Sequence, residues 1–333
     1  MYESYYNVYE SDQYVKEATS FDSLIEKAGK IESFCRDYKC PSESVEYIAP
    51  TEEVPFNRIS FAGHKMTLSR FALGQLGNKT GVPGKYIERC LLTGSYDLLE
   101  ENINYWLSMG SGDFLIRGNK EKVRGILSER YSIYDMGEIL SDIKETVDMD
   151  MFEVKEHLLN DERLHLRMVG KETMNIDGED DLFPALFVDS SDVGRCSIKV
   201  NLGIYKQVCT NGLIIRKYGG RLFNQKHVGI HVKDFREILR SSLCQTDSLI
   251  HRFEEMVSDT KNRDIPVDED GLVDFLKERV GLSVKASQTV QSLMNTKYDR
   301  SLWGLINGVT DVAQQYPLER RIELEELAGN LLN

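Results

Sequence analysis

The sequence has no long hydrophobic run. No stretch approaches the ~18 consecutive apolar residues that a membrane-spanning helix needs. The first six residues lack the basic and apolar regions of a secretory signal peptide. Of the 333 residues, 41% are hydrophobic and 29% are charged, so the chain has enough apolar side chains to bury a core. We therefore predict a folded cytoplasmic protein without a membrane partner, with about two domains at ~150 residues each.

Cysteine is also scarce. The chain has six cysteines and no CxxC motif, which is typical of a reducing compartment and leaves no cysteine zinc site. His227 and His231 have the spacing of zinc ligands on a helix. However, Val228 and Ile230 indicate a strand, in which residues four apart lie ~13 Å from one another. We therefore predict no metal site and no cofactor.

Standard catalytic motifs are missing. Gly84-Lys85 lacks the earlier glycine and the following Ser or Thr of a phosphate-binding loop. Gly110 and Gly112 lack the third glycine of a dinucleotide-binding fingerprint. Neither a GxSxG nor an HExxH motif occurs. These absences favour a binding protein over an enzyme, and we assign no catalytic residues.

Hydrophobic periodicity predicts the secondary structure. We expect a linker at 39–55 because it holds three prolines and several acids. The pair of helices around Gly81 resembles a helix-turn-helix, but its second helix offers only Lys85 and Arg89 to DNA, which favours a packed helical hairpin. We expect helices at 20–36, 67–77, 82–92, 98–107, 135–147 and in the region from 233 to the end, and strands at 114–117, 123–127, 152–154, 164–169, 184–188 and 196–200.

Glycine-containing turns suggest how the later strands connect. Asn211-Gly212 is a tight-turn signal, and Gly219-Gly220 is expected to join strands 213–216 and 228–232. The fold class is therefore α+β: an antiparallel sheet with a long twisted hairpin, helices before it and a helical C-terminal region. The expected domains are an N-terminal acidic arm, helix and linker at 1–55, an α+β core at 56–240, and a helical region at 241–333.

Charge is distributed unevenly along the chain. The net charge is −13, yet residues 195–240 hold 10 basic and 2 acidic residues, a net charge of +8. Basic side chains bind phosphates and aromatic rings stack on unpaired bases, so this block favours single-stranded nucleic acid. The alternatives are internal pairing with the acidic residues of 101–194, or an acidic protein partner. The candidate nucleic-acid-binding residues are Lys199, Lys206, Arg216, Lys217, Tyr218, Arg221, Lys226 and Lys233.

Three segments resemble a known family. These are Val123–Tyr131 with Asp135, Asp181–Gly194, and Val208–Ile214, which contains Val-Cys-Thr-Asn-Gly. They are similar to the "R-x-hLS-x-RY…D", "P-x-h-x-h-x-NSE-h-G" and "VCTNGM" segments of the phage- and plasmid-borne family called domain of unknown function 932. The residues 189–192, Asp-Ser-Ser-Asp, depart from the NSE pattern. The resemblance covers about residues 55–245.

This resemblance implies a bacteriophage or another mobile element, in a bacterial host cell. In that setting, a sheet with a basic hairpin is similar in fold to single-strand annealing recombinases of the Erf and RecT kind. The similarity implies a homo-oligomer that coats single-stranded DNA and promotes pairing without ATP. Arg216, Lys217, Arg221 and Lys226 would then contact phosphates, and Tyr218 would stack on a base.

Two other functions remain open. A phage-borne acidic protein with a tyrosine-rich N-terminal arm could bind a host protein and modulate or inhibit host defence. An enzyme could use Arg130 and Asp135, or Glu153 and Lys155, although Arg130 and Asp135 could equally form a structural clamp. Cys209 reads as a small buried side chain rather than as a nucleophile.

Overall fold

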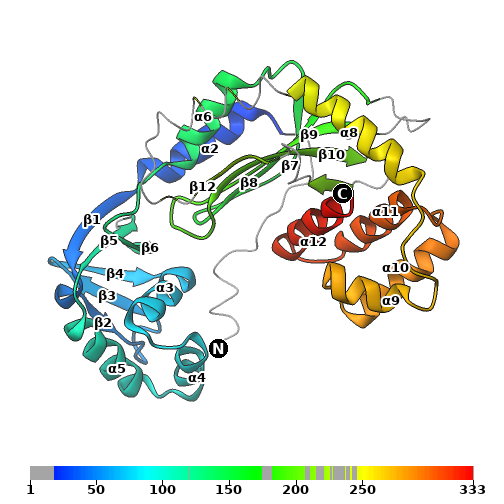
Figure 1. The fold of residues 1–333 in the computed structure, drawn as a ribbon. Helices are drawn as coiled ribbons and strands as arrows, with labels where there is room; N and C mark the ends of the chain where they lie inside the picture. Colours follow the sequence, from blue (N-terminus) through cyan, green and yellow to red (C-terminus); the bar gives the residue numbers. More distant parts are fainter. Residues whose placement is uncertain are drawn as a thin grey trace.

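The computed structural model describes residues 19–119, 121–174, 182–206, 211–214, 221–225, 227, 237, 241 and 246–332. The described chain forms an arch (Figure 1). One six-stranded sheet with its helices makes one foot, the C-terminal helices make the other, and a second sheet spans between them. This architecture confirms the α+β fold class. Within the described residues, no helix has the length and hydropathy to cross a membrane.

The first sheet is built from the N-terminal part of the chain and has the order β1-β5-β6-β4-β3-β2. Its pairings are antiparallel except for the parallel pair of β4 and β6. Helices α3, α4 and α5 pack on it around one apolar core. The elements are β1 (Arg36–Pro41), η1 (Ser42–Ser44), β2 (Glu46–Ile48), β3 (Arg58–Phe61), β4 (His64–Leu68), α3 (Arg70–Thr80), α4 (Gly84–Thr93), α5 (Tyr96–Met109), β5 (Asp113–Gly118) and β6 (Lys122–Ser128).

The expected linker at 39–55 is wrong, because part of this segment belongs to both outer strands of the first sheet. Tyr47 of β2 is fully buried, and its hydroxyl donates to Asn57 Oδ1 at 2.6 Å. The Asn104 side chain of α5 bonds both the backbone N–H and the carbonyl of Tyr47, at 2.7 and 2.9 Å. Asn57 and Asn104 lie ten and 57 residues from Tyr47 in the sequence, so a local sequence pattern does not predict these contacts.

The two short helices expected around Gly81 are confirmed as a packed pair. Gly81 ends α3 with φ of +72°, a conformation that favours glycine. A Cβ on Gly77 would lie 2.6 Å from the Ile87 side chain, so this glycine lets α4 approach α3. Lys85 and Arg89 of α4 are exposed, while the opposite face of α4 is buried.

The second sheet has the order β11-β10-β9-β8-β7, with β12 also on β10. All its described pairings are antiparallel. The core range predicted at 56–240 contributes strands to both sheets. The strands are β7 (Phe152–Leu159), β8 (Leu164–Gly170), β9 (Leu182–Ser190), β10 (Ile198–Lys206), β11 (Asn211–Ile214) and β12 (Arg221–Gln225).

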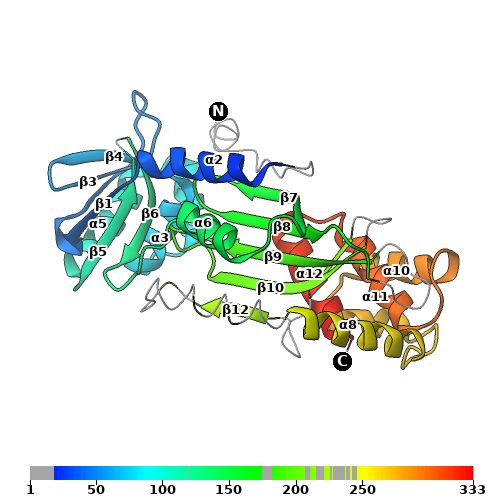
Figure 2. The ribbon, with the colours of Figure 1, turned by 90° about the horizontal axis from the view of Figure 1, so that it is seen from above.

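The two faces of the second sheet differ in polarity. Alternate residues such as Leu166, Leu186 and Val200 pack with α2 (Phe21–Ser33) and α6 (Met136–Thr146) in the largest apolar core. Figure 2 shows these two helices lying over the sheet. The residues between them point to the opposite face, which we call the polar face because it carries His165 and Arg167.

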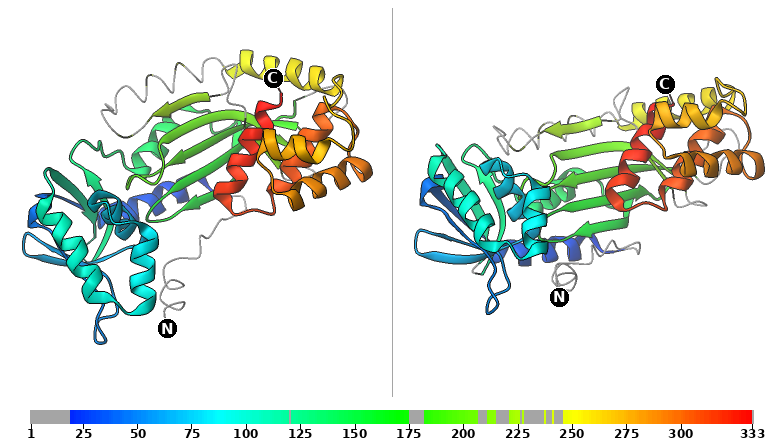
Figure 3. Two further views of the ribbon diagram at one scale, coloured as in Figure 1. Left: turned by 60° about the horizontal axis from the view of Figure 1, so that its bottom comes forward. Right: turned by 90° about the horizontal axis from the view of Figure 1, so that it is seen from below.

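The C-terminal helices gather at one end of the second sheet (Figure 3). The last of them, α12, lies against the polar face, where Ile322 packs with Phe187 and Tyr205. The helices are α8 (Thr246–Lys261), α9 (Leu272–Phe275), the π-helical turn η2 (Leu276–Val280), α10 (Val284–Thr296), α11 (Leu302–Ala313) and α12 (Leu318–Asn330).

Four buried charges fasten α12 to the polar face. Arg167 contacts Glu156 at 3.2 Å and Glu325 at 2.6 Å, and Arg321 contacts the same two carboxylates at 2.8 and 3.0 Å. None of these side chains is more than 4% exposed. Two positive and two negative charges therefore compensate one another away from water. We call this set the α12 quartet.

We predict that Glu325→Gln destabilises the protein by about 3 kcal/mol, because it leaves Arg167 and Arg321 with too few buried carboxylates. The measurement is the urea-unfolding midpoint and slope at neutral pH. Glu323→Gln is the matched control, since Glu323 lies on the same helix, is 60% exposed and pairs only locally with Arg320. We expect the control to change stability by less than about 0.5 kcal/mol. Equal losses in both variants would contradict this role of the quartet.

Candidate functional site

A buried ion cluster joins the two sheets. Asp192, which follows β9, is fully buried and accepts two bonds from Arg124 of β6, at 2.9 and 3.0 Å. Arg117 of β5 lies 3.2 Å from the same carboxylate. Arg124 Nε also donates to the Asp161 carbonyl after β7, at 2.8 Å. Two adjacent strands of the first sheet thus hold two loops of the second, an arrangement that we call the junction cluster.

Arg117 also contacts two carboxylates from the first half of the chain. Asp37 of β1 lies 3.3 Å away, and Asp135, at the start of α6, is in direct contact. Burial alone would lower the pKa of Arg117, but Asp192, Asp135 and Asp37 raise it above its ordinary value. Arg117 is therefore charged at every pH at which the protein folds, and its role here is to hold carboxylates.

Asp135 performs the local role that the sequence indicates. It forms a capping box with Glu138 at the N-terminus of α6, as predicted. The suggested clamp between Arg130 and Asp135 is wrong, because Arg130 is exposed and Asp135 contacts Arg117 instead. Sequence reasoning missed Arg117, since nothing in its own strand indicates a buried cation.

An aromatic pair closes the junction cluster on one side. The Tyr131 hydroxyl donates to the Ser191 carbonyl at 2.8 Å, and its ring stacks on His227 with centroids 4.9 Å apart. Both ring nitrogens of His227 are buried. Burial lowers the pKa of His227 to about 4. His227 is therefore neutral at pH 7 and contributes a packing surface.

Close backbone approach makes this arrangement possible. A Cβ on Gly125 would lie 3.0 Å from Val193 Cβ, so the loop after β9 can rest on β6 only if this residue is glycine or its neighbours move. Gln75 of α3 links the loop after β9 to β6. Its side chain donates to the Val193 carbonyl and accepts from the Ile126 N–H, both at 2.8 Å.

Cys35 borders the junction cluster. Its Sγ lies 2.8 Å from Arg124 Nη1, and burial raises the pKa of the thiol despite the two nearby arginines. A pocket of about 640 Å³ opens beside it, between the end of α2 and the turn before β6. The thiol is protonated at neutral pH, so this position lacks the depressed pKa of a reactive cysteine.

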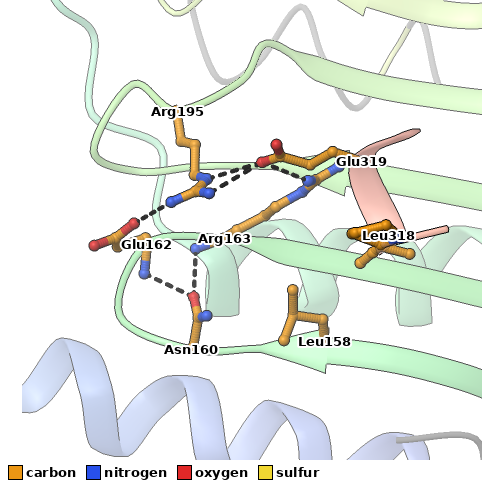
Figure 4. Close-up of a pocket in the computed structure, with 8 residues that line it drawn as sticks. Leu158, Asn160, Glu162, Arg163, Arg195, Leu318 and Glu319 are labelled. Carbon is orange, nitrogen blue, oxygen red and sulfur yellow. Dashed lines mark hydrogen bonds and ion pairs between the residues drawn. The ribbon is translucent and has the colours of Figure 1, made fainter. Parts of the chain in front are cut away.

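A second group of charges lies around the β7–β8 turn and the loop after β9, next to the N-terminus of α12 (Figure 4). Arg163 contacts the buried Asp189 at 2.6 Å, and Asp189 also accepts from His165 at 3.1 Å. Burial would raise the pKa of Asp189, but His165 and Arg163 lower it well below its usual range. Arg195 contacts Glu162 at 2.5 Å and Glu319 at 3.0 Å.

Glu162, Arg163, Arg195 and Glu319 border a small pocket of about 100 Å³. Arg163 Nη1 and Arg195 converge on one oxygen of Glu319, at 3.5 and 3.0 Å. We call Arg163, Arg195 and Glu319 the arginine pair and its carboxylate. The pocket is lined by Leu158, Asn160, Glu162, Arg163, Arg195, Pro317, Leu318 and Glu319.

The structure places only some of the predicted nucleic-acid-binding residues. Lys199 and Lys206 are half-buried on β10, and their spacing puts them on opposite faces of the sheet, with Lys199 on the polar face. Arg221 begins β12, opposite Asn201 of β10. The other candidates, Arg216, Lys217, Tyr218, Lys226 and Lys233, lie outside the described residues, as do Cys209 and His231.

The strands near these residues pair differently from the prediction. Asn211 and Gly212 belong to β11, opposite Lys206 and Tyr205, and so do not form the expected tight turn. Strands β11 and β12 both pair with β10, end to end along the same edge. The described pairings therefore differ from the expected hairpin across Gly219-Gly220, because β11 and β12 share one edge of β10. The second strand of that expected hairpin, 228–232, lies outside the described residues.

The other suggested chemistry finds no assembled site in the described part of the chain. Glu153 and Lys155 pair with each other at 2.5 Å on the surface of β7. No three His, Cys, Asp or Glu side chains of the described residues come close enough to hold a metal ion.

The sequence matches one family over residues 123–330, which is more than half of the chain. The family is described as Domain of unknown function (DUF932). The chain belongs to this family. No curated protein and no solved structure is significantly similar to it. The likeness to annealing recombinases of the Erf and RecT kind stays a prediction.

The DUF932 match corrects the extent of the resemblance. It begins in β6 and ends in α12, so it contains the whole second sheet and the C-terminal helices. Compared with this match, the range of 55–245 expected from the motifs begins and ends too early in the sequence. Arg124, Asp135 and Asp192 of the junction cluster lie inside the DUF932 region, whereas Arg117 and Asp37 lie before it.

We predict that His227→Phe removes part of the acid sensitivity of this DUF932 chain. The native state holds His227 with a pKa of about 4, below its ordinary 6.5, so the unfolded state binds more protons between these two values. Stability that is present above pH 6.5 is thus lost as the pH falls towards 4, by up to about 3 kcal/mol.

Phenylalanine keeps the stack on Tyr131 without this titration. The measurement is the free energy of unfolding of both proteins at several pH values between 7 and 4. As the pH falls from 7 to 4, the free energy of unfolding should decrease more for the unmodified protein than for the variant. A difference that stays constant over this range would show that His227 does not titrate as its burial implies.

Proposed function

We propose that this protein binds single-stranded nucleic acid along the β10 edge and the polar face of the second sheet. The observation that carries the proposal is the register of β11 and β12. Ile214, which ends β11, lies opposite Gly203, and Arg221, which begins β12, lies opposite Asn201. Both ends of the segment 215–220 are therefore attached to the same edge of β10, about 7 Å apart.

The register shows that Ile214 and Arg221, the described residues on either side of segment 215–220, lie at one edge of the sheet. Segment 215–220 contains Arg216, Lys217 and Tyr218, the two cations and the ring that we expect to contact phosphates and a base. Lys199 of β10 lies on the polar face next to that edge, opposite the exposed Asn224 of β12. Lys199 and Asn224 thus offer one cation and one hydrogen-bonding group to a phosphate backbone at this edge.

A phage or plasmid function in single-strand annealing would follow from such binding. In that case the protein assembles into a homo-oligomer on single-stranded DNA and pairs strands without ATP. Sequence-tolerant binding is expected, because phosphate contacts and stacking do not distinguish bases.

A different observation favours a second candidate function. Helix α5 exposes Leu98, Tyr105, Trp106 and Met109, each with at least half of its surface accessible. Such a cluster is typical of protein interfaces. A protein-interaction module that modulates a host defence protein would use this helix. Its binding would depend weakly on salt, whereas nucleic-acid binding weakens steeply as salt rises.

We predict that the double variant Arg216→Glu and Lys217→Glu binds a labelled single-stranded oligonucleotide at least about tenfold more weakly than the unmodified protein. The measurement is fluorescence anisotropy from ~50 to ~200 mM salt, with single- and double-stranded oligonucleotides in parallel. Losing two phosphate contacts should reduce the slope of log affinity against log salt by about 1.4.

The control reverses two exposed cations elsewhere, Arg279→Glu and Lys285→Glu, which lie in η2 and α10. It changes the net charge equally and should leave the slope unchanged. No binding by the unmodified protein at ~50 mM salt, or equal binding by the two double variants, would refute the proposal.

A further inference from the structure

We propose that Arg163 and Arg195 form a binding site for one backbone phosphate, which the Glu319 carboxylate occupies when no nucleic acid is bound. This inference rests on the proposed function and adds a regulated contact to it. The contact lies between the β7–β8 turn, the loop after β9 and the first turn of α12 (Figure 4).

The first support is the geometry of the arginine pair. Arg195 directs Nε and Nη2 to one oxygen of Glu319, at 3.2 and 3.0 Å, and Arg163 Nη1 approaches the same oxygen at 3.5 Å. A guanidinium edge that presents two parallel N–H groups also matches the oxygens of a phosphate. The carboxylate of Glu319 therefore stands where a phosphate oxygen could be bound.

Each arginine keeps its position without Glu319. Arg163 is held by the buried Asp189 at 2.6 Å, and Arg195 by Glu162 at 2.5 Å. The guanidinium of Arg195 also lies over the ring of Phe71, 5.7 Å from its centroid. The site is therefore preorganised, and exchanging one anion for another costs little rearrangement.

The charges also balance. Asp189 and Glu162 already match the two arginines, so Glu319 adds one further negative charge beside the pocket. A phosphodiester carries one negative charge too. Replacement of Glu319 by a backbone phosphate thus leaves the net charge of the site unchanged. A phosphate at this place keeps the favourable position near the N-terminus of α12 that Glu319 now has.

Glu319 is free to leave while α12 stays in place. Its side chain is 60% exposed, so water can take over its hydrogen bonds. The helix itself is fastened by the buried α12 quartet, which does not include Glu319. Rotation of one side chain therefore opens the site.

The pocket gives the incoming group a place to sit. Its volume is about 100 Å³, well above the ~10–15 Å³ that one water requires, and the nine-tenths buried Arg163 lines it. Arg163 Nε is buried, and it has no hydrogen-bond partner among the described residues. An unsatisfied buried donor of a charged group is costly, and a bound oxygen or water within reach would reduce that cost.

The test measures single-stranded DNA binding by the full chain and by Glu319→Gln, using the same anisotropy titration in salt. Removing the occupying carboxylate should raise the affinity at least about threefold at ~50 mM salt. One additional phosphate contact should steepen the slope of log affinity against log salt by about 0.7.

Glu323→Gln is the matched control, since Glu323 lies on the same helix, is equally exposed and carries the same charge. It should leave the slope unchanged. Adding Arg195→Gln to Glu319→Gln should abolish the gain, and thermal unfolding of each variant verifies that it is folded.

The outcomes separate the two proposals. Equal slopes and affinities for Glu319→Gln and Glu323→Gln, with clear binding by the unmodified protein, would overturn the phosphate site and leave the proposed function standing. Absence of binding in every variant would overturn both. A gain in Glu319→Gln that persists after Arg195→Gln would show that the carboxylate acts by general repulsion and would also overturn the site.

Discussion

The structure depends on one buried carboxylate. Asp192 is shared by Arg117 and Arg124, which come from two adjacent strands of the first sheet. A charge buried without partners costs several kcal/mol, and its partners here belong to the other sheet. The cost is offset only when both sheets are formed and docked. The junction cluster thus couples the folding of the two sheets. It also fixes the positions of the β7–β8 and β9–β10 loops against the first sheet.

The polar face follows from the same principle. A sheet covered by α2 and α6 on one side can expose charges on the other, yet Glu156 and Arg167 are buried there. They are tolerated because α12 brings Arg321 and Glu325, which complete a neutral set. Charge complementarity therefore fixes the place of α12 on the sheet. Apolar contacts such as that of Ile322 with Phe187 add packing, but they would allow several positions.

Sequence patterns predicted the elements whose causes are local. The capping box of Asp135 and Glu138 marks the start of α6 within four residues, and short apolar runs on either side of a polar turn mark β5 and β6. Strand pairing is not local. Strand β1 pairs with β5, so that Arg36 lies opposite Gly118, whereas the prolines at 41, 50 and 55 favoured a linker that begins inside this strand. In the same way, a glycine pair indicates a turn but not a partner strand, so the sequence favoured a hairpin of 213–216 with 228–232 and did not indicate that β11 and β12 both pair with β10.

The candidate site shows why charge counts along a sequence leave its function open. Arg195 belongs to the basic block and pairs with Glu162 of the acidic block, so the internal-pairing alternative holds for this residue. Its second partner, Glu319, comes from a helix more than a hundred residues later. Internal pairing and phosphate binding were posed as competing explanations, but they exclude one another only for buried pairs. Where the carboxylate is exposed and the cation is held by other contacts, the ion pair keeps the cation oriented, and another anion can compete for it.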